Sequence, residues 1–309
     1  MPCERLHLRY NSGEFSEHVM EEMMKNPVAL IIIYNHSYEK NIALLEKIYS
    51  DKFTTILHLM PFYTGTKENV IPIYENPHRF HGYIAQSKQA LLNTSCDTFV
   101  FAADDLLINP ELCEENILDT LGIPADHCYL PCFSIGKINS YWAHAIKALH
   151  FFNNAAGCEG VRALPDKEAA LRLITRHLPQ YCLDVSTSAF FKEGVPENIP
   201  QKMKLPYPLI GGYSDFFIVT RPALTLFAHY CGIFSAMNLF VEIALPTALA
   251  FSTRKISKTF GNGYTRGEIW EKEKLDELKL QHDLSLDKLL NEFPSKKAYL
   301  HPIKLSEWS

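Results

Sequence analysis

Two adjacent carboxylates stand at the end of a short apolar run, and this junction constrains the chain more than any other feature. Residues 99–103 are all apolar, and Asp104 and Asp105 follow them directly. A short apolar run of this kind is typical of a buried strand. Ligands of open α/β sheets bind outside the carboxyl ends of the strands. The junction therefore predicts a ligand site at the edge of such a sheet.

A carboxylate pair at this position suits a hard divalent cation, Mg²⁺ or Mn²⁺, with a diphosphate as the other ligand. The alternative is that Asp104 caps the following turn and that Asp105 is only solvated. Both interpretations stay open at the level of the sequence.

The residues before the junction predict the rest of an α/β unit. Residues 28–36 contain a second near-continuous apolar run, typical of a central strand. Apolar spacing predicts helices over 41–49 and 81–92 and a strand over 54–60. Alternating strands and helices in this order indicate the nucleotide-binding half of an α/β domain. No glycine-rich phosphate loop follows the first strand, which argues against the usual dinucleotide and P-loop sites.

Composition indicates an ordinary globular protein. The chain has 309 residues, of which 47% are hydrophobic and 21% charged. Its net charge of −5 argues against nonspecific nucleic-acid binding. Its 8 cysteines are irregularly spaced, and Cys128 and Cys132 have no second Cys or His pair nearby. We therefore expect reduced thiols in a cytoplasmic protein rather than a zinc site.

Membrane insertion is not expected, although one segment is long and apolar. Residues 224–251 are interrupted by His229, Asn238, Glu242 and Pro246, and charge within a membrane span is costly. The segment predicts a buried helix or a helix pair, and residues 1–10 lack the apolar stretch of a secretory signal. Peripheral association with a membrane surface stays open. Further expected elements are helices over 141–152, 166–177 and 268–280, a strand over 216–219, and irregular chain over 196–208.

Two carboxylates of the second half are candidate proton acceptors. Glu242 is isolated in an apolar helix, where burial would raise its pKa. Its alternative is a structural ion pair with Arg221 or Arg254. Asp215 follows two consecutive glycines, which permit close approach of a ligand. Either carboxylate is a candidate general base.

The end of the chain contains His301 and Lys304. The apolar residues around them follow no clear pattern that would predict packing against the rest of the protein. Imidazole is a suitable Mn²⁺ ligand beside carboxylate and phosphate oxygens. A lysine nearby would stabilise negative charge on a diphosphate. We expect residues 300–309 to order over a bound diphosphate as a lid. The alternative is an exposed tail with a chance His and Lys, since the chain has 13 histidines.

Together these features resemble the GT-A fold of nucleotide-sugar-dependent glycosyltransferases. The Asp104-Asp105 junction is similar to the acidic DxD region of that family. His301 and Lys304 are similar to a C-terminal histidine and lysine that some GT-A enzymes, such as the glycogenin-like family, bring to the metal and the diphosphate. In the usual motif two acids flank one residue, so a motif aligned on Asp105 would have Ala103 at its first acid. This departure puts the metal dependence in doubt more than the fold.

The resemblance implies an α/β fold, a Rossmann-like GT-A three-layer sandwich with a mixed central sheet. It implies a single catalytic domain over 1–309, with 1–135 as the nucleotide-sugar-binding half and 136–309 as the acceptor-binding half and tail. It further implies transfer of a sugar, from a UDP-sugar by default, to a hydroxyl of a glycan or other acceptor. Mn²⁺ or Mg²⁺ would be held by Asp104, Asp105 and His301, and the oligomeric state stays open.

Sheet topology and the resemblance place further residues near the nucleotide. Tyr34 is expected to stack on the base and Asn35 to hydrogen-bond it, because both end the first strand. The full set of expected nucleotide-binding residues is Tyr34, Asn35, His36, Arg79, Gln86, Lys88, Asp104 and Lys304. A solvated position on the helix over 81–92, or just before it, is the alternative for Arg79, Gln86 and Lys88.

Two other functions are compatible with this pattern. A sugar-phosphate nucleotidyltransferase has a similar architecture, but it normally has a glycine-rich basic loop after the first strand, which residues 34–37 do not provide. A non-catalytic GT-A-like binding or scaffold protein would suit the displaced acidic motif.

Overall fold

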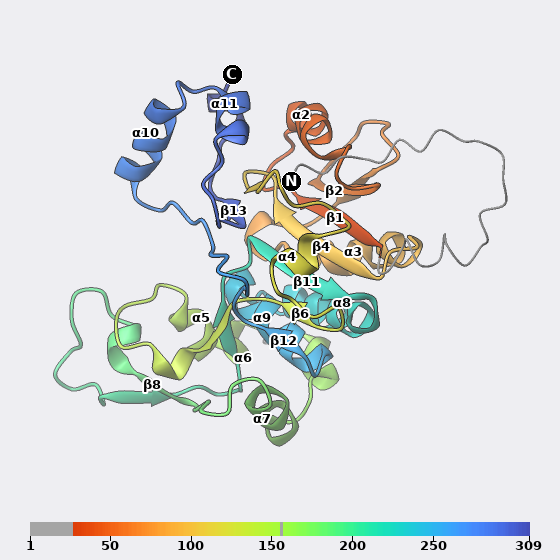
Figure 1. Ribbon diagram of the computed structural model, residues 1–309. Coiled ribbons are helices and arrows are strands. Elements are labelled where there is room, and N and C mark those ends of the chain that lie inside the picture. The colour runs from red at the N-terminus through yellow and green to blue at the C-terminus, as the bar shows by residue number, and fades with distance from the viewer. Residues whose placement is uncertain (1–26, 155–156) are drawn as a thin grey trace, which may run out of the picture.

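A mixed seven-stranded sheet runs through the protein (Figure 1). The computed structural model describes residues 27–154 and 157–309, so residues 1–10, where no secretory signal was expected, lie outside the described chain. The strand order is β12-β6-β11-β4-β1-β2-β3. The strands are β1 (Val28–Ile33), β2 (Thr55–Pro61), β3 (Val70–Ile73), β4 (Thr98–Ala103), β6 (Cys128–Tyr129), β11 (Phe216–Thr220) and β12 (Ile256–Ser257).

Parallel pairing in one half of this sheet brings the first strand and the acidic junction together. β1 lies between β2 and β4 and pairs with both in parallel, with Ile33 opposite Ala103. β11 lies antiparallel to β4, so a strand from the second half of the sequence is inserted beside the strands of the first. Asp104 therefore follows the last residue of β4 and lies beside the end of β1.

Helices cover both faces of the sheet. Successive residues of a buried strand point to opposite faces, so the residues of β1 belong to two different apolar clusters. Ala29, Ile31 and Ile33 belong to one apolar cluster, and Leu30 and Ile32 belong to the other. The first cluster contains residues of α3 (His81–Leu92), α8 (Arg221–Ala236) and α9 (Val241–Ser252). The second contains residues of α2 (Glu39–Tyr49), α4 (Ile117–Thr120) and α11 (Leu286–Asn291). The α/β class with a mixed central sheet is confirmed.

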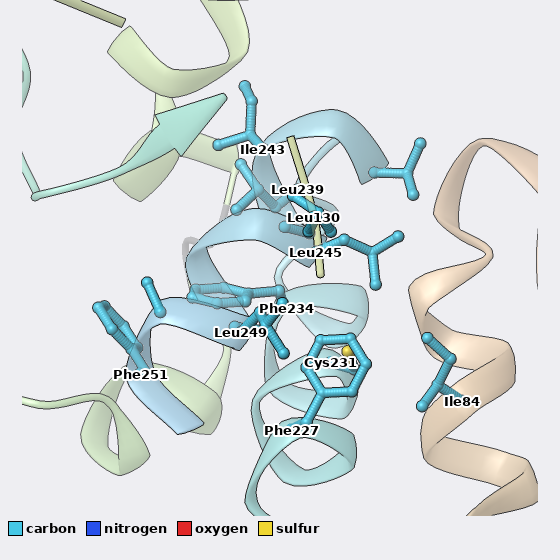
Figure 2. Packing of buried hydrophobic residues seen from close by; sticks show 14 of the residues in the cluster. Ile84, Leu130, Phe227, Cys231, Phe234, Leu239, Ile243, Leu245, Leu249 and Phe251 are labelled. Atoms are coloured by element: carbon cyan, nitrogen blue, oxygen red, sulfur yellow. The ribbon is translucent and has the colours of Figure 1, made fainter. Parts of the chain in front are cut away.

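The long apolar segment of the second half forms a helix pair, as predicted. α8 and α9 pack against each other, and α8 also packs against α3. Figure 2 shows Phe227, Cys231 and Phe234 of α8 in the same apolar cluster as Leu249 of α9 and Ile84 of α3. Within the described residues, no helix is long and apolar enough to cross a membrane.

The smaller elements differ more from the sequence predictions. The helix expected over 141–152 is two short helices, and the one expected over 268–280 begins only at Lys272. Residues 196–208, expected to be irregular, contain a three-residue strand. The remaining elements are α5 (Ala145–Leu149), α6 (Phe151–Asn154), α7 (Lys167–Thr175), α10 (Lys272–Gln281), β5 (Leu107–Ile108), β7 (Cys132–Ser134), β8 (Asp184–Ser186), β9 (Lys202–Lys204), β10 (Ile210–Gly212), β13 (Tyr299–Leu300) and the 3₁₀ turns Pro77–Arg79, Ile135–Lys137, Glu159–Ala163, Thr187–Ala189 and Leu305–Glu307.

The two glycines before Asp215 serve packing within the protein rather than the approach of a ligand. They lie in β10, which pairs with β7. A Cβ atom on Gly211 would lie 2.5 Å from the ring of Phe133, and one on Gly212 would lie 2.6 Å from the carbonyl oxygen of Pro131. The side chains and backbone of neighbouring segments therefore occupy the space that these glycines leave open.

The C-terminal segment is packed into the apolar core, which corrects the expectation of a loosely attached lid. β13 pairs antiparallel with β5, directly after the acidic junction. The side chains of Ile303, Leu305 and Trp308 are buried, and Ile303 is 0% exposed. The sequence was misleading here because these apolar residues are separated by polar ones.

We expect Ile303→Ala to lower the free energy of unfolding by about 3 kcal/mol, since truncation of a buried isoleucine leaves a cavity. Urea unfolding measures the change. Ser306→Ala is the control, because Ser306 is exposed in the same segment, and it should be nearly neutral. Equal stability of Ile303→Ala and the parent protein would contradict the packed arrangement of the tail.

Candidate functional site

Asp104, at the end of β4, accepts two hydrogen bonds from the segment that follows β1. Its Oδ1 accepts a hydrogen bond from the backbone N–H of Asn35 at 3.4 Å, and its Oδ2 accepts one from Nδ2 of Asn41 at 3.1 Å. Burial, and then the neighbouring charge of Asp105, raise the pKa of Asp104 to about 7. A positive charge placed at this edge would favour the ionised form.

Three ionisable side chains form a row beside Asp104, although they come from distant parts of the sequence. Oδ1 of Asp105 lies 3.2 Å from Nε2 of His301, and Nδ1 of His301 lies 3.7 Å from Oδ2 of Asp215. Burial by itself would lower the pKa of His301, but the carboxylates of Asp105 and Asp215 outweigh it and raise that pKa. The imidazole is thus held between two carboxylates.

Backbone pairing fixes His301 in this position. Its N–H donates to the carbonyl of Gly267 at 3.0 Å, and its carbonyl accepts from the N–H of Ile269 at 2.7 Å. Two residues later, the N–H of Ile303 donates to the carbonyl of Asp105 at 2.5 Å. The Trp270 ring meets the imidazole edge to face at 5.3 Å between centroids. These contacts explain why α10 starts later than predicted, since residues 267–269 pair with the tail instead.

Glu242 lies in the first turn of α9 and within electrostatic reach of Asp215. Burial, and then the charge of Asp215, raise its pKa to about 7. The alternative ion pair with Arg221 or Arg254 is wrong for the described residues. Arg221 instead pairs with Asp97 and donates to the carbonyls of three residues near the other end of β4, and Arg254 forms no ion pair with the described carboxylates.

A pocket of about 360 Å³ opens directly over Asp104 and Asp105. It brings together five of the residues predicted from the sequence, including Lys304 from the end of the chain. The residues that line it are Asn35, His36, Tyr38, Asn41, Asp104, Asp105, Lys304, Leu305 and Ser306. Lys304 is 64% exposed on its side chain, and its Nζ lies 3.8 Å from Oε1 of Glu307.

Tyr34 is wrongly predicted as a stacking residue for a base. Its side chain is fully buried, and its hydroxyl hydrogen-bonds Nδ1 of His58 at 2.9 Å. It belongs to the same apolar cluster as Leu30 and Ile32, because the alternation of β1 continues one residue beyond the strand. The ring therefore points into the core beneath the pocket.

The expected residues before and along α3 lie outside the set that lines the pocket. The amide of Gln86 is occupied at both ends by the backbone of Tyr74, at 2.9 and 3.3 Å. Arg79 is held by Glu75 at 2.9 Å and by Asn238 at 3.2 Å. Lys88 lies two turns along α3, away from the sheet edge at which the helix begins. Gln86 and Arg79 thus have structural contacts of their own.

Sequence reasoning missed several residues of the site. Asn41 is in the first turn of α2 and holds Asp104, and Tyr38 lines the pocket beside it. Glu268 accepts a hydrogen bond from the Tyr299 hydroxyl at 3.0 Å and lies 3.3 Å from Nε of Arg266. The polar run after the first strand signalled the first two residues. The role of Glu268 depends on long-range pairing with the tail, which no local pattern reveals.

The donor atoms at Asp105 and His301 fit two neighbouring positions around a divalent ion. Metal bonds of about 2.1 Å at right angles separate adjacent ligand atoms by roughly 3 Å, close to the spacing found here. Oδ1 of Asp105 is also buried without a hydrogen-bond partner. In residues 27–154 and 157–309 no cluster of three or more His, Cys, Asp or Glu side chains is arranged for a metal. A bound ion would therefore need further ligands from a substrate or water, as is common for Mg²⁺ beside phosphates.

Comparison with protein-family models and with curated proteins finds no match to this chain.

The raised pKa of Glu242 predicts how stability changes with pH. The folded state keeps this proton up to about pH 7, whereas the unfolded chain releases it near 4.5. The unfolded state thus binds fewer protons across this interval, so stability falls as the pH rises through it and changes little above it. Asp104 acts in the same direction, because its pKa is also raised. Between pH 5 and 8, the fall in melting temperature should be smaller in Glu242→Gln by about 2 °C. Calorimetric scans measure it, and an unchanged fall would contradict the raised pKa of this half-buried carboxyl.

Proposed function

We propose that this protein is a metal-assisted glycosyltransferase with a GT-A-like fold, which moves a sugar from a nucleoside-diphosphate sugar to a hydroxyl of a glycan or other acceptor. The observation that carries the proposal is the meeting of the tail with the acidic junction. His301 lies 3.2 Å from Asp105, and Lys304 lines the same pocket as Asp104, although almost 200 residues separate them in sequence. Packing alone does not require two carboxylates, an imidazole and an ammonium at one sheet edge.

The fold supports the finer GT-A assignment. The sheet is mixed, helices cover both faces, and the pocket lies at the carboxyl ends of β1 and β4. This edge is where α/β proteins bind nucleotides. We take a uridine diphosphate sugar as the default donor.

Asp105 and His301 are the residues that would hold the cation, with Mn²⁺ or Mg²⁺ as candidates. When bound, such an ion neutralises charge on a diphosphate leaving group. Lys304 would add a second positive charge at the same pocket, because its exposed ammonium is held, among the described residues, only by a 3.8 Å contact with Glu307 and would exchange it for phosphate oxygens. Asp215 acts as a positioning residue in this scheme, since it contacts His301 on the side away from Asp105.

Asn35, His36 and Tyr38 would bind the base and ribose, because they form the part of the pocket contributed by the loop after β1. Asp104 holds this loop through Asn35 and Asn41, and it would thereby fix the position of the nucleotide.

Glu242 is the residue that would take the proton from the attacking hydroxyl. A general base works best with a pKa near the working pH, and burial gives Glu242 a pKa of about 7. Among the described residues Glu242 has no cationic partner that would hold it ionised, whereas Asp215 is already in contact with His301. We therefore assign the base to Glu242 rather than to Asp215, and neither carboxylate is among the residues that line the pocket over Asp104 and Asp105.

Calorimetric titration with UDP, with and without MnCl₂, tests the proposal. We expect binding that depends on Mn²⁺ and that weakens about tenfold in Lys304→Ala, because a charge-assisted contact to phosphate is lost. Lys88→Ala is the matched control and should bind UDP like the parent protein.

The alternative functions give different results in the same titration. Absence of binding to any nucleotide would favour a non-catalytic protein. Tighter binding of a nucleoside triphosphate, with release of pyrophosphate in the presence of a sugar phosphate, would favour a nucleotidyltransferase. Equal UDP affinity in Lys304→Ala and the parent would remove Lys304 from the phosphate site.

A further inference from the structure

A second pocket, of about 480 Å³, lies beside the row of ionisable residues on the side of the sheet that carries β6 and β11. This volume is within the range of small-molecule sites, about 300–1,000 Å³. Tyr213 lines it and is two residues from Asp215, and Arg266 lines it and contacts Glu268. The charge of Glu268 reaches both Asp215 and His301. The second pocket therefore adjoins the proposed reaction site.

The two pockets share no lining residue. One is built from the loop after β1 and the tail, and the other from β6, β7 and the chain around residues 258–266. Two ligands can therefore occupy them at the same time. Asp105, at one end of the row, lines the first pocket, and Asp215, at the other end, is two residues from Tyr213 of the second pocket. Separate sites for donor and acceptor are compatible with a transfer reaction, in which both substrates must be bound together.

Two cationic side chains point to an anionic ligand in the second pocket. The Arg266 side chain lines the pocket and is 34% exposed, and its Nε lies 3.3 Å from the carboxylate of Glu268. Lys258 adds a second cation, whose Nζ donates to the carbonyl of His177 at 3.1 Å and contacts no described carboxylate.

Aromatic rings form most of the remaining wall. The guanidinium of Arg266 lies 4.7 Å from the centre of the Tyr213 ring, and Tyr129 stacks on Phe260 at 4.3 Å. Phe133 and Tyr264 complete the wall. Aromatic walls with a few fixed polar groups suit a ligand that has both an apolar face and a charge. A pyranose ring with an anionic substituent has both properties.

We propose that this second pocket binds the acceptor, and that the acceptor is a sugar carrying a phosphate ester or a carboxylate. Arg266 and Lys258 bind its anionic group, and the aromatic wall contacts the face of its ring. The role of this sugar as an acceptor rests on the proposed function. The binding of an anionic sugar to the second pocket does not depend on it.

Calorimetry with three sugars tests this assignment on the full chain. The probes are glucose 6-phosphate, glucuronate and glucose, each titrated alone and in the presence of UDP and MnCl₂. We expect at least one anionic sugar to bind ten or more times tighter than glucose. The phosphate and carboxylate probes distinguish the two sources of the negative charge.

Lys258→Met should weaken the binding of the anionic sugar at least tenfold. Lys255→Met is the matched control, since Lys255 is exposed, pairs with Asp126 and lines a different pocket. Retained UDP binding and an unchanged melting temperature show that Lys258→Met is folded.

Three outcomes overturn the assignment: glucose that binds as tightly as both anionic sugars, no binding of either anionic sugar, or an affinity unchanged by Lys258→Met. The UDP titration separates this failure from that of the proposed function. If UDP binds and the anionic sugars do not, only the acceptor assignment is wrong. If the anionic sugars bind and UDP does not, the pocket stands as a sugar site, and both its role as an acceptor site and the transferase proposal are wrong.

Discussion

Glu242→Gln is expected to lower kcat by about 10³-fold while UDP affinity stays within about twofold of the parent value. The amide has almost the size of the carboxyl but cannot accept the proton of an attacking hydroxyl. Burial and the charge of Asp215 raise the pKa of Glu242 to about 7, so kcat of the parent protein should rise with pH up to that value and level off. The measurement is turnover of a nucleotide sugar under saturating donor.

The matched control is Asp215→Asn. Asp215 contacts His301 at 3.7 Å and acts on its orientation and charge, so its replacement should weaken Mn²⁺-dependent UDP binding as well as turnover. If Glu242→Gln changes only the melting temperature, Glu242 is a structural residue. The role of base would then have to be tested at Asp215.

Asp105→Asn is the second replacement with a large expected effect. Loss of the carboxylate removes one of the two protein ligands proposed for the cation, and we expect Mn²⁺-dependent UDP affinity to fall by about 100-fold. The fold should persist, because the contact that anchors the tail here is the backbone carbonyl of Asp105 with the N–H of Ile303. Calorimetry gives the affinity, and circular dichroism gives the fold.

Asp105→Asn also removes the negative charge that lies 3.2 Å from Nε2 of His301. The pKa of His301 should then fall, since Asp105 is one of the three carboxylates, with Asp215 and Glu268, that raise it. The NMR resonance of the His301 ring should therefore titrate at lower pH in Asp105→Asn than in the parent protein. UDP affinity that is the same in the variant and the parent, with Mn²⁺ present, would remove Asp105 from the metal site.

Local patterns in the sequence predicted the central part of the fold. The apolar runs that became β1 and β4 and the spacing of α3 are strong signals, because a strand or helix covered by other layers needs a continuous apolar surface. Polar interruptions in the segment that became α8 and α9 argued against a membrane span. The position of Asp104 and Asp105 at the sheet edge then followed from parallel pairing of β1 with β4.

Long-range pairing explains what could not be predicted. β13 is only two residues long and pairs with an equally short β5, so neither shows a recognisable strand pattern. This pairing buries Ile303 and determines that His301 meets Asp105, which turns an expected mobile lid into a packed wall of the pocket. Tyr34 was misjudged for a different reason, because its direction depends on where the alternation of β1 ends. Arg266 and Glu268 were missed because they join the site only through long-range contacts, Glu268 with Tyr299 and Arg266 with the Tyr213 ring.

The most direct test of the proposed metal and diphosphate site is a crystal structure of the protein with UDP and Mn²⁺, collected at a wavelength where manganese gives an anomalous signal. We predict an anomalous peak about 2.1 Å from both Oδ1 of Asp105 and Nε2 of His301, with the diphosphate between this peak and Lys304. A structure in which UDP binds elsewhere, or occupies the pocket without an anomalous peak at these two atoms, would contradict the proposed site.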